Sequence, residues 1–219
     1  TPTIANTFGL PAGKSYSCPN QTPTCAKVCY AGKLEKIYKG FRNVLISNWD
    51  QLKDADYDTM VSLLTEMIND FKKDCDKRGA DKLFRIHWDG DFFNDTYVLA
   101  WAETIRVNPD VQFWVYTRVP FAAEMLKGIR NLSLYFSTDD DNKAMAFDLR
   151  TNQKIKLAYL GKTFADTKNI MIELTGKPGA MCAENAKRIP LISSNGSACV
   201  SCGLCVFGKA DIRFSATKK

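Results

Sequence analysis

The sequence predicts an α/β protein, arranged as a partial (β/α)6-like barrel of mostly parallel strands with a cysteine-rich C-terminal extension. Apolar runs rich in β-formers alternate with amphipathic helical stretches, and most connections are long enough for right-handed crossover helices. Polar or cysteine-bearing segments follow the first four runs, as expected where parallel strands end at a functional face. We expect one α/β domain over residues 1–178 and an extension over residues 179–219 that packs on it.

Six strands are expected from these runs, at residues 4–10, 83–87, 111–116, 132–136, 154–160 and 170–174. The linker at residues 161–168 is too short for a full crossover helix. The last two strands are therefore expected to pair antiparallel or to be irregular.

Five helices are expected, at residues 31–49, 57–79, 95–107, 120–128 and 144–149. The second has the clearest pattern, because apolar side chains recur from Tyr57 to Cys75 at helical spacing until Gly79 ends it. Cys75 lies on this stripe and is expected in the core. Asn108-Pro109 ends the third helix, and Pro120 opens the fourth within its first turn.

Composition describes an ordinary globular chain of 219 residues, with 45% apolar and 25% charged residues. No apolar run approaches the roughly 18 residues of a membrane span, and residues 1–12 lack a secretory pattern, so a cytoplasmic location without membrane attachment is expected. The net charge of +6 is mild and its cations are spread along the chain. Nucleic acid is therefore not indicated as a partner.

Four cysteines near the C-terminus indicate a metal centre. Cys199, Cys202 and Cys205 follow one another at two-residue spacers, and Cys182 precedes them. In a reducing compartment such thiols are metal ligands more often than disulfides. The spacers suit a 4Fe–4S cluster, and a four-cysteine zinc site is the alternative.

Three further cysteines, Cys18, Cys25 and Cys29, follow the first expected strand. They can hold a second cluster with one open iron, a cluster completed by another residue, or zinc completed by His87. His87 is the sole histidine, and the alternative is a hydrogen-bonded pocket residue. One cluster or two, and which cysteines hold each, stays open at this level.

The N-terminal loop resembles that of the radical S-adenosylmethionine enzymes. Their motif is CxxxCxxC with an aromatic residue beside the last cysteine, whereas this chain reads CxxxxxxCxxxC with Tyr30 after Cys29. In those enzymes an acid-ended glycine segment after the second strand holds the amino group of the cofactor, and Gly90-Asp91 is similar in placement. The segments CYAGK, HWDGDF and VYTR and the terminal CxxCxxC resemble a phage family of the gene product 88 domain type. The resemblance implies a phage-encoded protein in the host cytoplasm.

Polar residues at the next strand ends complete the expected cofactor site. Asp89 and Asp91 can bind an ammonium group or ribose hydroxyls, or belong to a solvated turn around Gly90. Arg118 can clamp a carboxylate or pair with a neighbouring aspartate. Ser137 and Thr138 offer hydroxyl groups at the fourth strand end.

Three functions fit these residues, and no catalytic residue is assigned. The first is an iron–sulfur protein on a radical-SAM-like scaffold, acting as an S-adenosylmethionine-dependent redox enzyme on a small-molecule substrate. The second is a non-enzymatic iron–sulfur protein that transfers electrons to a redox partner or senses redox state. The third is a zinc-stabilised binding module. The oligomeric state is left open.

Overall fold

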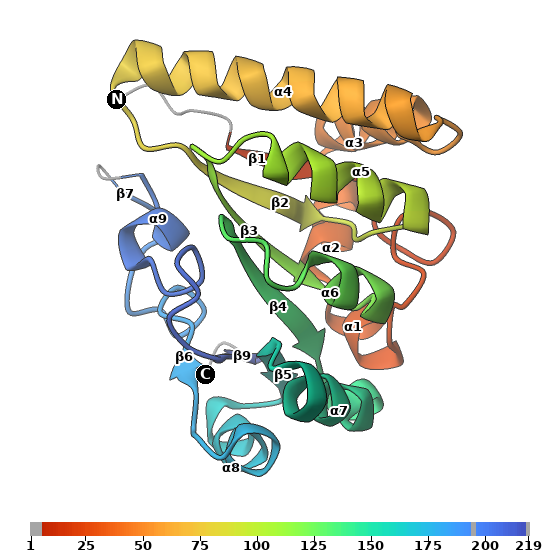
Figure 1. Cartoon of the computed structure of the whole chain (residues 1–219). Coiled ribbons are helices and arrows are strands. Elements are labelled where there is room, and N and C mark those ends of the chain that lie inside the picture. The colour runs from red at the N-terminus through yellow and green to blue at the C-terminus, as the bar shows by residue number, and fades with distance from the viewer. Residues whose placement is uncertain (1–5, 194–195, 218–219) are drawn as a thin grey trace.

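The computed structural model of the protein describes residues 6–193 and 196–217. A seven-stranded, all-parallel sheet forms its centre (Figure 1). Its strand order is β1-β2-β3-β4-β5-β9-β6, with every neighbouring pair parallel. The strands are β1 Thr7–Gly9, β2 Leu83–Asp89, β3 Gln112–Thr117, β4 Leu132–Thr138, β5 Lys156–Gly161, β6 Ala180–Met181 and β9 Ile212–Ser215. The α/β class and the parallel sheet are thus confirmed. The strand order by itself does not establish a barrel.

The helices connect consecutive strands. They are α1 Pro23–Val28, α2 Tyr30–Ile37, α3 Lys39–Leu52, α4 Tyr57–Arg78, α5 Asp95–Arg106, α6 Pro120–Leu126, α7 Lys143–Gln153, α8 Phe164–Thr175 and α9 Ala198–Cys202. A 3-10 turn, η1 (Asp140–Asn142), precedes α7, and β7 (Ile192–Ser193) and β8 (Gly196–Ser197) form a small hairpin. Among the described helices, none combines the length and apolar character needed to cross a bilayer.

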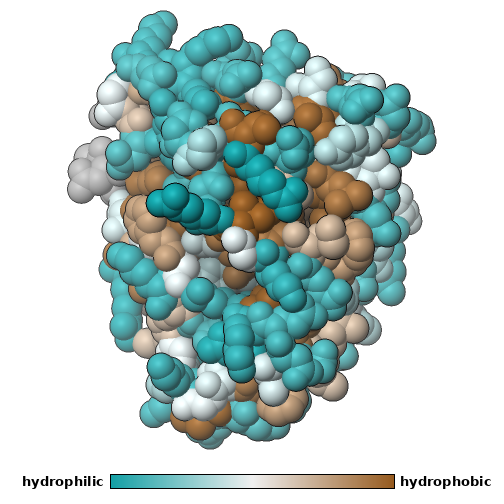
Figure 2. All heavy atoms as spheres, in the orientation of Figure 1, coloured by the Kyte–Doolittle hydropathy of each residue, from teal (hydrophilic) through white to brown (hydrophobic). Residues whose placement is uncertain are grey.

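Neighbouring strands β1 to β5 also follow one another in sequence, and this order determines how the two faces of the sheet are covered. Right-handed crossovers between successive neighbours place the connecting helices on one face. Figure 1 shows α4, α5, α6 and α7 on that side, and α9 on the other side. The outer surface of α4, at the top of Figure 2, is mostly hydrophilic, while apolar side chains show in the middle of the same view.

The second face of the sheet is covered by the C-terminal segment. Val206 is fully buried between Leu83 of β2 and Trp114 of β3. Leu204 packs on a neighbouring cluster around Tyr135 of β4. The same segment provides β6 and β9, so residues beyond the expected boundary at 178 contribute to the central sheet.

The expected strand at residues 170–174 is wrong, because this segment is part of helix α8. Thr163 and Asp166 form a capping box at the start of the helix, which satisfies two of its free backbone N–H groups. Thr167, Met171 and Leu174 are buried at helical spacing against β5. The expected antiparallel pairing of strands five and six is therefore also wrong, since β5 pairs in parallel with β9.

The expected helix at residues 31–49 is two helices, α2 and α3, which meet at Tyr38. Tyr38 adopts an extended backbone (φ −112°, ψ 92°) that ends the first helix. Other expectations agree closely with the structure: Gly79 ends α4 with φ 61°, and Pro120 opens α6. The first expected strand reaches back to Ile4, which lies outside the described residues.

Candidate functional site

The N-terminal cysteine loop is built from two short helices with polar caps. Thr22 caps α1, and its Oγ1 accepts a hydrogen bond from the N–H of Cys25 at 3.0 Å. Cys29 caps α2 with its Sγ, which accepts from the N–H of Gly32 at 3.3 Å. Cys18 lies before both helices. Local capping thus fixes the backbone at Cys25 and orients the thiol of Cys29.

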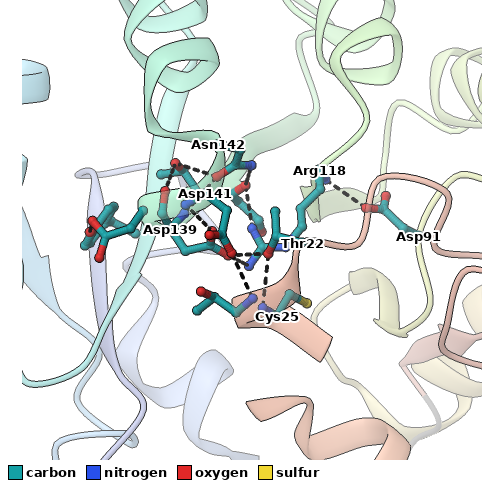
Figure 3. Close-up of polar contacts among 12 residues, drawn as sticks. Thr22, Cys25, Asp91, Arg118, Asp139, Asp141 and Asn142 are labelled. Atoms are coloured by element: carbon teal, nitrogen blue, oxygen red, sulfur yellow. Dashed lines mark hydrogen bonds and ion pairs between the residues drawn. The ribbon is translucent and has the colours of Figure 1, made fainter. Parts of the chain in front are cut away.

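Long-range hydrogen bonds join this loop to the end of β4 (Figure 3). The hydroxyl of Thr22 donates to Asp139 Oδ2 at 2.7 Å, and the N–H of Thr24 donates to Asp141 Oδ2 at 2.8 Å. Asp139 is fully buried. The predicted meeting of the cysteine loop with the strand ends is therefore present in the structure.

Arg118, at the end of β3, forms an ion pair with Asp139, whose Oδ2 lies 3.1 Å from Nη2. Its Nη1 donates to the carbonyl of Ser137 at 2.8 Å. The side chain of Arg118 is 10% exposed. Of the two roles expected for Arg118, the structure contains the pair with a neighbouring aspartate.

The carboxylate of Asp91 is occupied by protein donors. Oδ1 accepts from the hydroxyl of Thr117 at 2.7 Å and from the N–H of Phe92 at 2.8 Å. Oδ2 accepts from the N–H of Arg118 at 2.7 Å. Burial raises the pKa of Asp91 to about 6, although these hydrogen bonds act to lower it.

Asp89 differs, because one of its oxygens has no donor. Oδ1 accepts from the N–H of Gly90 at 2.8 Å, while the buried Oδ2 has no hydrogen-bond partner among the described atoms. Burial, and then the neighbouring carboxylate of Glu35, raises the pKa of Asp89 to about 8. Glu35 is itself buried and accepts from the N–H of Ala12 at 2.9 Å. The two carboxyl groups form a buried acidic pair beside the cysteine loop.

The remaining predicted cofactor residues also lie at the C-terminal ends of the strands, a region that we call the mouth. Gly90 has φ 83° and lies against Leu10 and Ser17, the residue before Cys18. The hydroxyl of Thr138 donates to Asn142 Oδ1 at 3.0 Å. Ser137 takes part through its carbonyl, as described above for Arg118. Gly90 therefore contacts the segment that leads into the cysteine loop, whereas Thr138 and Ser137 bond to residues at the strand ends.

Cys25 lies within electrostatic range of both other N-terminal thiols. Burial, followed by the carboxylate of Asp91, raises the pKa of Cys18 to about 12. Burial is also the largest cause that raises the pKa of Cys29, and Cys25 adds to the rise for both thiols. Cys25 is therefore a neighbour of Cys18 and of Cys29.

The four C-terminal cysteines form a second group on the opposite face of the sheet from α4 and α5. Cys182 follows β6, Cys199 and Cys202 belong to α9, and Gly203 ends α9 with φ 68°. Burial, with a smaller contribution from the thiols of Cys199, Cys182 and Cys202, raises the pKa of Cys205 to about 12. Cys182 and Cys205 pack against the same cluster around Tyr135, so Cys182 lies near the CxxCxxC segment.

Two residues that the sequence did not single out lie beside this second group. Burial acts to lower the pKa of Arg85, but Tyr30, Tyr116 and Cys199 together raise it above its usual value. The guanidinium lies 5.4 Å from the ring centroid of Tyr116, and Tyr116 and Cys205 pack against the same apolar clusters. The signal available in the sequence for Arg85 was a cation inside the apolar run at residues 83–86.

His87 and Cys75 have structural roles that are separate from the two cysteine groups. His87 Nε2 is 2.9 Å from the hydroxyl of Tyr97, and burial lowers the pKa of His87 to about 3. His87 is therefore the hydrogen-bonded pocket residue of the two alternatives. Cys75 lies on the inner side of α4 and is fully buried in the core, as the apolar stripe of this helix predicted.

No disulfide links any of the eight cysteines. Within residues 6–193 and 196–217, no three His, Cys, Asp or Glu side chains converge closely enough to hold a single metal ion. The thiols are thus gathered into two groups, but each group is wider than the coordination sphere of one ion.

Fold and site together define a class: an α/β protein with an all-parallel sheet, three cysteines in the segment after β1 and four in the C-terminal segment. The sequence profile of the Gene product 88 family matches residues 1–208, and the chain belongs to this family of mycobacteriophage proteins. It is 55% identical to the Gene 88 protein of Mycobacterium phage L5 over 219 residues, covering 99% of this chain and 89% of that protein. It is 53% identical to the Gene 88 protein of Mycobacterium phage D29 over 220 residues, with the same coverage. No solved structure matches.

Proposed function

We propose that this phage protein is an iron–sulfur protein whose two cysteine groups hold 4Fe–4S clusters on a radical-SAM-like scaffold. The observation that carries the proposal is the gathering of Cys182 with Cys199, Cys202 and Cys205, which are separated by up to 23 positions in the sequence. Four thiols that lie near one another could serve as the four thiolate ligands of such a cluster.

The surroundings of the C-terminal group support the same conclusion. A cluster with four thiolate ligands carries net negative charge, which Arg85 is placed to offset. The side chain of Tyr116 lies beside Cys205 and lowers the pKa of this thiol, and polar groups near ligand sulfurs tune the potential of such clusters. These residues would orient and stabilise the bound cluster, and the cluster would supply one-electron chemistry.

Of the two iron–sulfur functions, electron transfer or redox sensing is favoured by the geometry of the mouth. Asp91 was expected to bind the cofactor from the resemblance to radical SAM enzymes, and Arg118 from its position at a strand end. Both side chains are instead bonded to other residues of the protein. They do not fit a bound S-adenosylmethionine in this arrangement. We derive no reaction step through that cofactor.

Anaerobic purification with iron and sulfide analysis tests the proposal. We expect iron and acid-labile sulfide in comparable amounts, with the broad visible absorption of an iron–sulfur protein. Cys202→Ala should lose the iron of one cluster, whereas Cys75→Ala, a matched thiol in the core, should keep it. A colourless protein loaded with zinc would contradict the proposal and favour a zinc-stabilised module.

Addition of S-adenosylmethionine to the reduced protein separates the two iron–sulfur functions. For an electron carrier we expect the electron paramagnetic resonance signal to stay unchanged. A change in the signal would show that the cofactor reaches an open iron, and would favour the enzyme.

A further inference from the structure

Helices α2 and α3 form an exposed corner that the proposed iron–sulfur chemistry does not use. All nine residues at positions 36–44 are exposed, on both sides of the bend at Tyr38. In its 14 residues α3 buries only Leu45 and Leu52. A helix of this length with so few buried side chains has most of its surface available to a partner.

Charge on residues 33–44 of this corner has one sign. They contain four cationic residues: Lys33, Lys36, Lys39 and Arg42. Their single acidic residue, Glu35, is buried and lies 3.9 Å from Arg42. None of the three lysines forms an ion pair with another described residue. Residues 33–44 therefore present cations without exposed carboxylates, and the exposed Asp50 near the end of α3 pairs with Lys53.

Aromatic and apolar side chains lie between these cations. Tyr38 is 59% exposed and Phe41 is 39% exposed, and Phe41 packs on Trp88 at 4.5 Å between ring centroids. A hollow of about 760 Å³ at the bend is lined by Leu34, Ile37, Tyr38, Lys39, Gly40 and Phe41. We call residues 33–44 the α2–α3 surface.

We propose that the α2–α3 surface binds single-stranded nucleic acid. Cations along the helices would contact phosphates, and the exposed ring of Tyr38 beside the hollow would stack on a base. A protein partner is less well matched, because protein interfaces are depleted in lysine and a carboxylate-free rim offers no partner for basic residues. The cations are spaced three positions apart, so a linear reading of the sequence shows no basic cluster, whereas folding places them on one corner.

Binding of a short fluorescein-labelled single-stranded oligonucleotide, followed by anisotropy, tests this inference. We expect binding at low salt that weakens as salt increases, because released counterions drive the association. Lys36→Ala/Lys39→Ala should bind about tenfold more weakly, with a salt slope reduced by about 1.4 for two lost phosphate contacts. Lys73→Ala/Lys77→Ala, which removes the same charge from exposed positions on α4, should bind like the unmodified protein.

Base stacking is tested by Tyr38→Ala, which should weaken binding about 5- to 100-fold. Tyr57→Ala removes a comparably exposed ring from the start of α4 and should have no effect. Circular dichroism and thermal melting of each variant establish that the fold is kept. Poly-glutamate should compete poorly, since it offers charge without bases.

Three results would overturn the inference. The first is no binding of the oligonucleotide by the unmodified protein at low salt. The second is an equal loss of affinity in the Lys36/Lys39 and Lys73/Lys77 double variants. The third is equal binding of the oligonucleotide and poly-glutamate. The last result would identify a general site for acidic chains. Because these assays need no iron, they can fail while the iron–sulfur proposal stands, and the reverse also holds.

Discussion

Arg118 and Asp139 form the most enclosed ion pair found among the described residues, and it joins two strand ends to the cysteine loop. Removing one partner of a buried pair leaves the other charge without compensation. We expect Arg118→Ala to lower the free energy of unfolding by about 3–5 kcal/mol. Urea denaturation followed by circular dichroism measures this change.

Arg106→Ala is the matched control, because Arg106 is exposed in the last turn of α5. We expect a change within about 0.5 kcal/mol for that variant. Equal effects of the two substitutions would show that the pair at the mouth does not stabilise the fold.

Asp89 makes stability depend on pH with a predictable sign. Its pKa in the folded protein is about 8, above the usual value of about 3.9 in an unfolded chain. The folded state therefore holds more protons between these values, and the free energy of unfolding should fall as pH rises from about 4 to about 8. Asp89→Asn should flatten this dependence and be the more stable form at pH 8.

Urea denaturation of both proteins across this pH range measures the difference. Glu35→Gln should flatten the dependence as well, because Glu35 is the second largest cause of the raised pKa of Asp89. Asp58→Asn, an exposed carboxyl on α4, serves as the control. Parallel curves for Asp89→Asn and the unmodified protein would contradict the assignment.

Single residues divide clearly into those that the sequence could assign and those that it could not. Cys182 could be joined to Cys199, Cys202 and Cys205 because thiols are rare and their spacing is informative. Glu35 could not be joined to Asp89, because an acidic residue in a helix rich in lysine is typical of a solvated surface. Only the packing of α2 against β2 shows that this carboxyl is buried.

The segment before the cysteine loop packs closely against the end of β2, and this contact requires a glycine at position 90. A Cβ added to Gly90 would collide with the Ser17 side chain and lie 2.9 Å from both Cβ and O of Leu10. Because Gly90 also has φ 83°, Gly90→Ala adds backbone strain to this collision. We expect a loss of about 2–4 kcal/mol and a displaced cysteine loop.

Gly40→Ala is the corresponding control, since a Cβ there meets nothing within 4 Å and alanine favours the helix α3. We expect this variant to be unchanged or slightly more stable in urea. Limited proteolysis near Cys18 measures the displacement of the cysteine loop directly. We expect cleavage there to increase for Gly90→Ala and to stay unchanged for Gly40→Ala. Equal stability of the two variants would contradict the close approach.

Helices with strong end signals were predictable as elements, and those without them were not. Gly79 and Pro120 bound α4 and α6 as expected. For α8, the apolar run at residues 170–174 has a composition typical of a strand. The cap at Thr163, which marks the start of the helix, lies seven positions earlier and is not part of that run. The bend at Tyr38 has no proline or glycine at the bend itself, so continuous periodicity across it suggested one helix.

Over the whole molecule, the C-terminal segment acts as a cover for the second face of the sheet. Val206 lies between Leu83 and Trp114, so Val206→Asp would bury an unpaired charge at the centre of this contact. We expect the segment to detach and to become sensitive to proteolysis between residues 182 and 208, with loss of more than about 3 kcal/mol of stability.

Phe207→Asp provides a neighbouring control, because Phe207 is 52% exposed. That variant should resist proteolysis as the unmodified protein does. Identical cleavage of both variants would mean that the segment is not held by the Val206 contact.

The architecture as a whole was predictable to the level of an α/β fold with parallel strands. The strand contributed by residues 212–215 was not, because it is short and follows an irregular cysteine-rich segment. Its pairing with β5 depends on contacts such as Asp211 with the N–H of Leu157 at 2.8 Å, which sequence patterns do not encode.

The hydrogen bond between Thr22 and Asp139 spans 117 positions, and this separation has a consequence for how the chain is made. During translation the cysteine loop leaves the ribosome long before β4 exists to hold it. Contacts of such separation also form slowly, because the entropy of closing a long loop must be offset first. The three N-terminal thiols are therefore exposed to oxidants and to free metal ions in the nascent chain, and their oriented arrangement is a late product of synthesis.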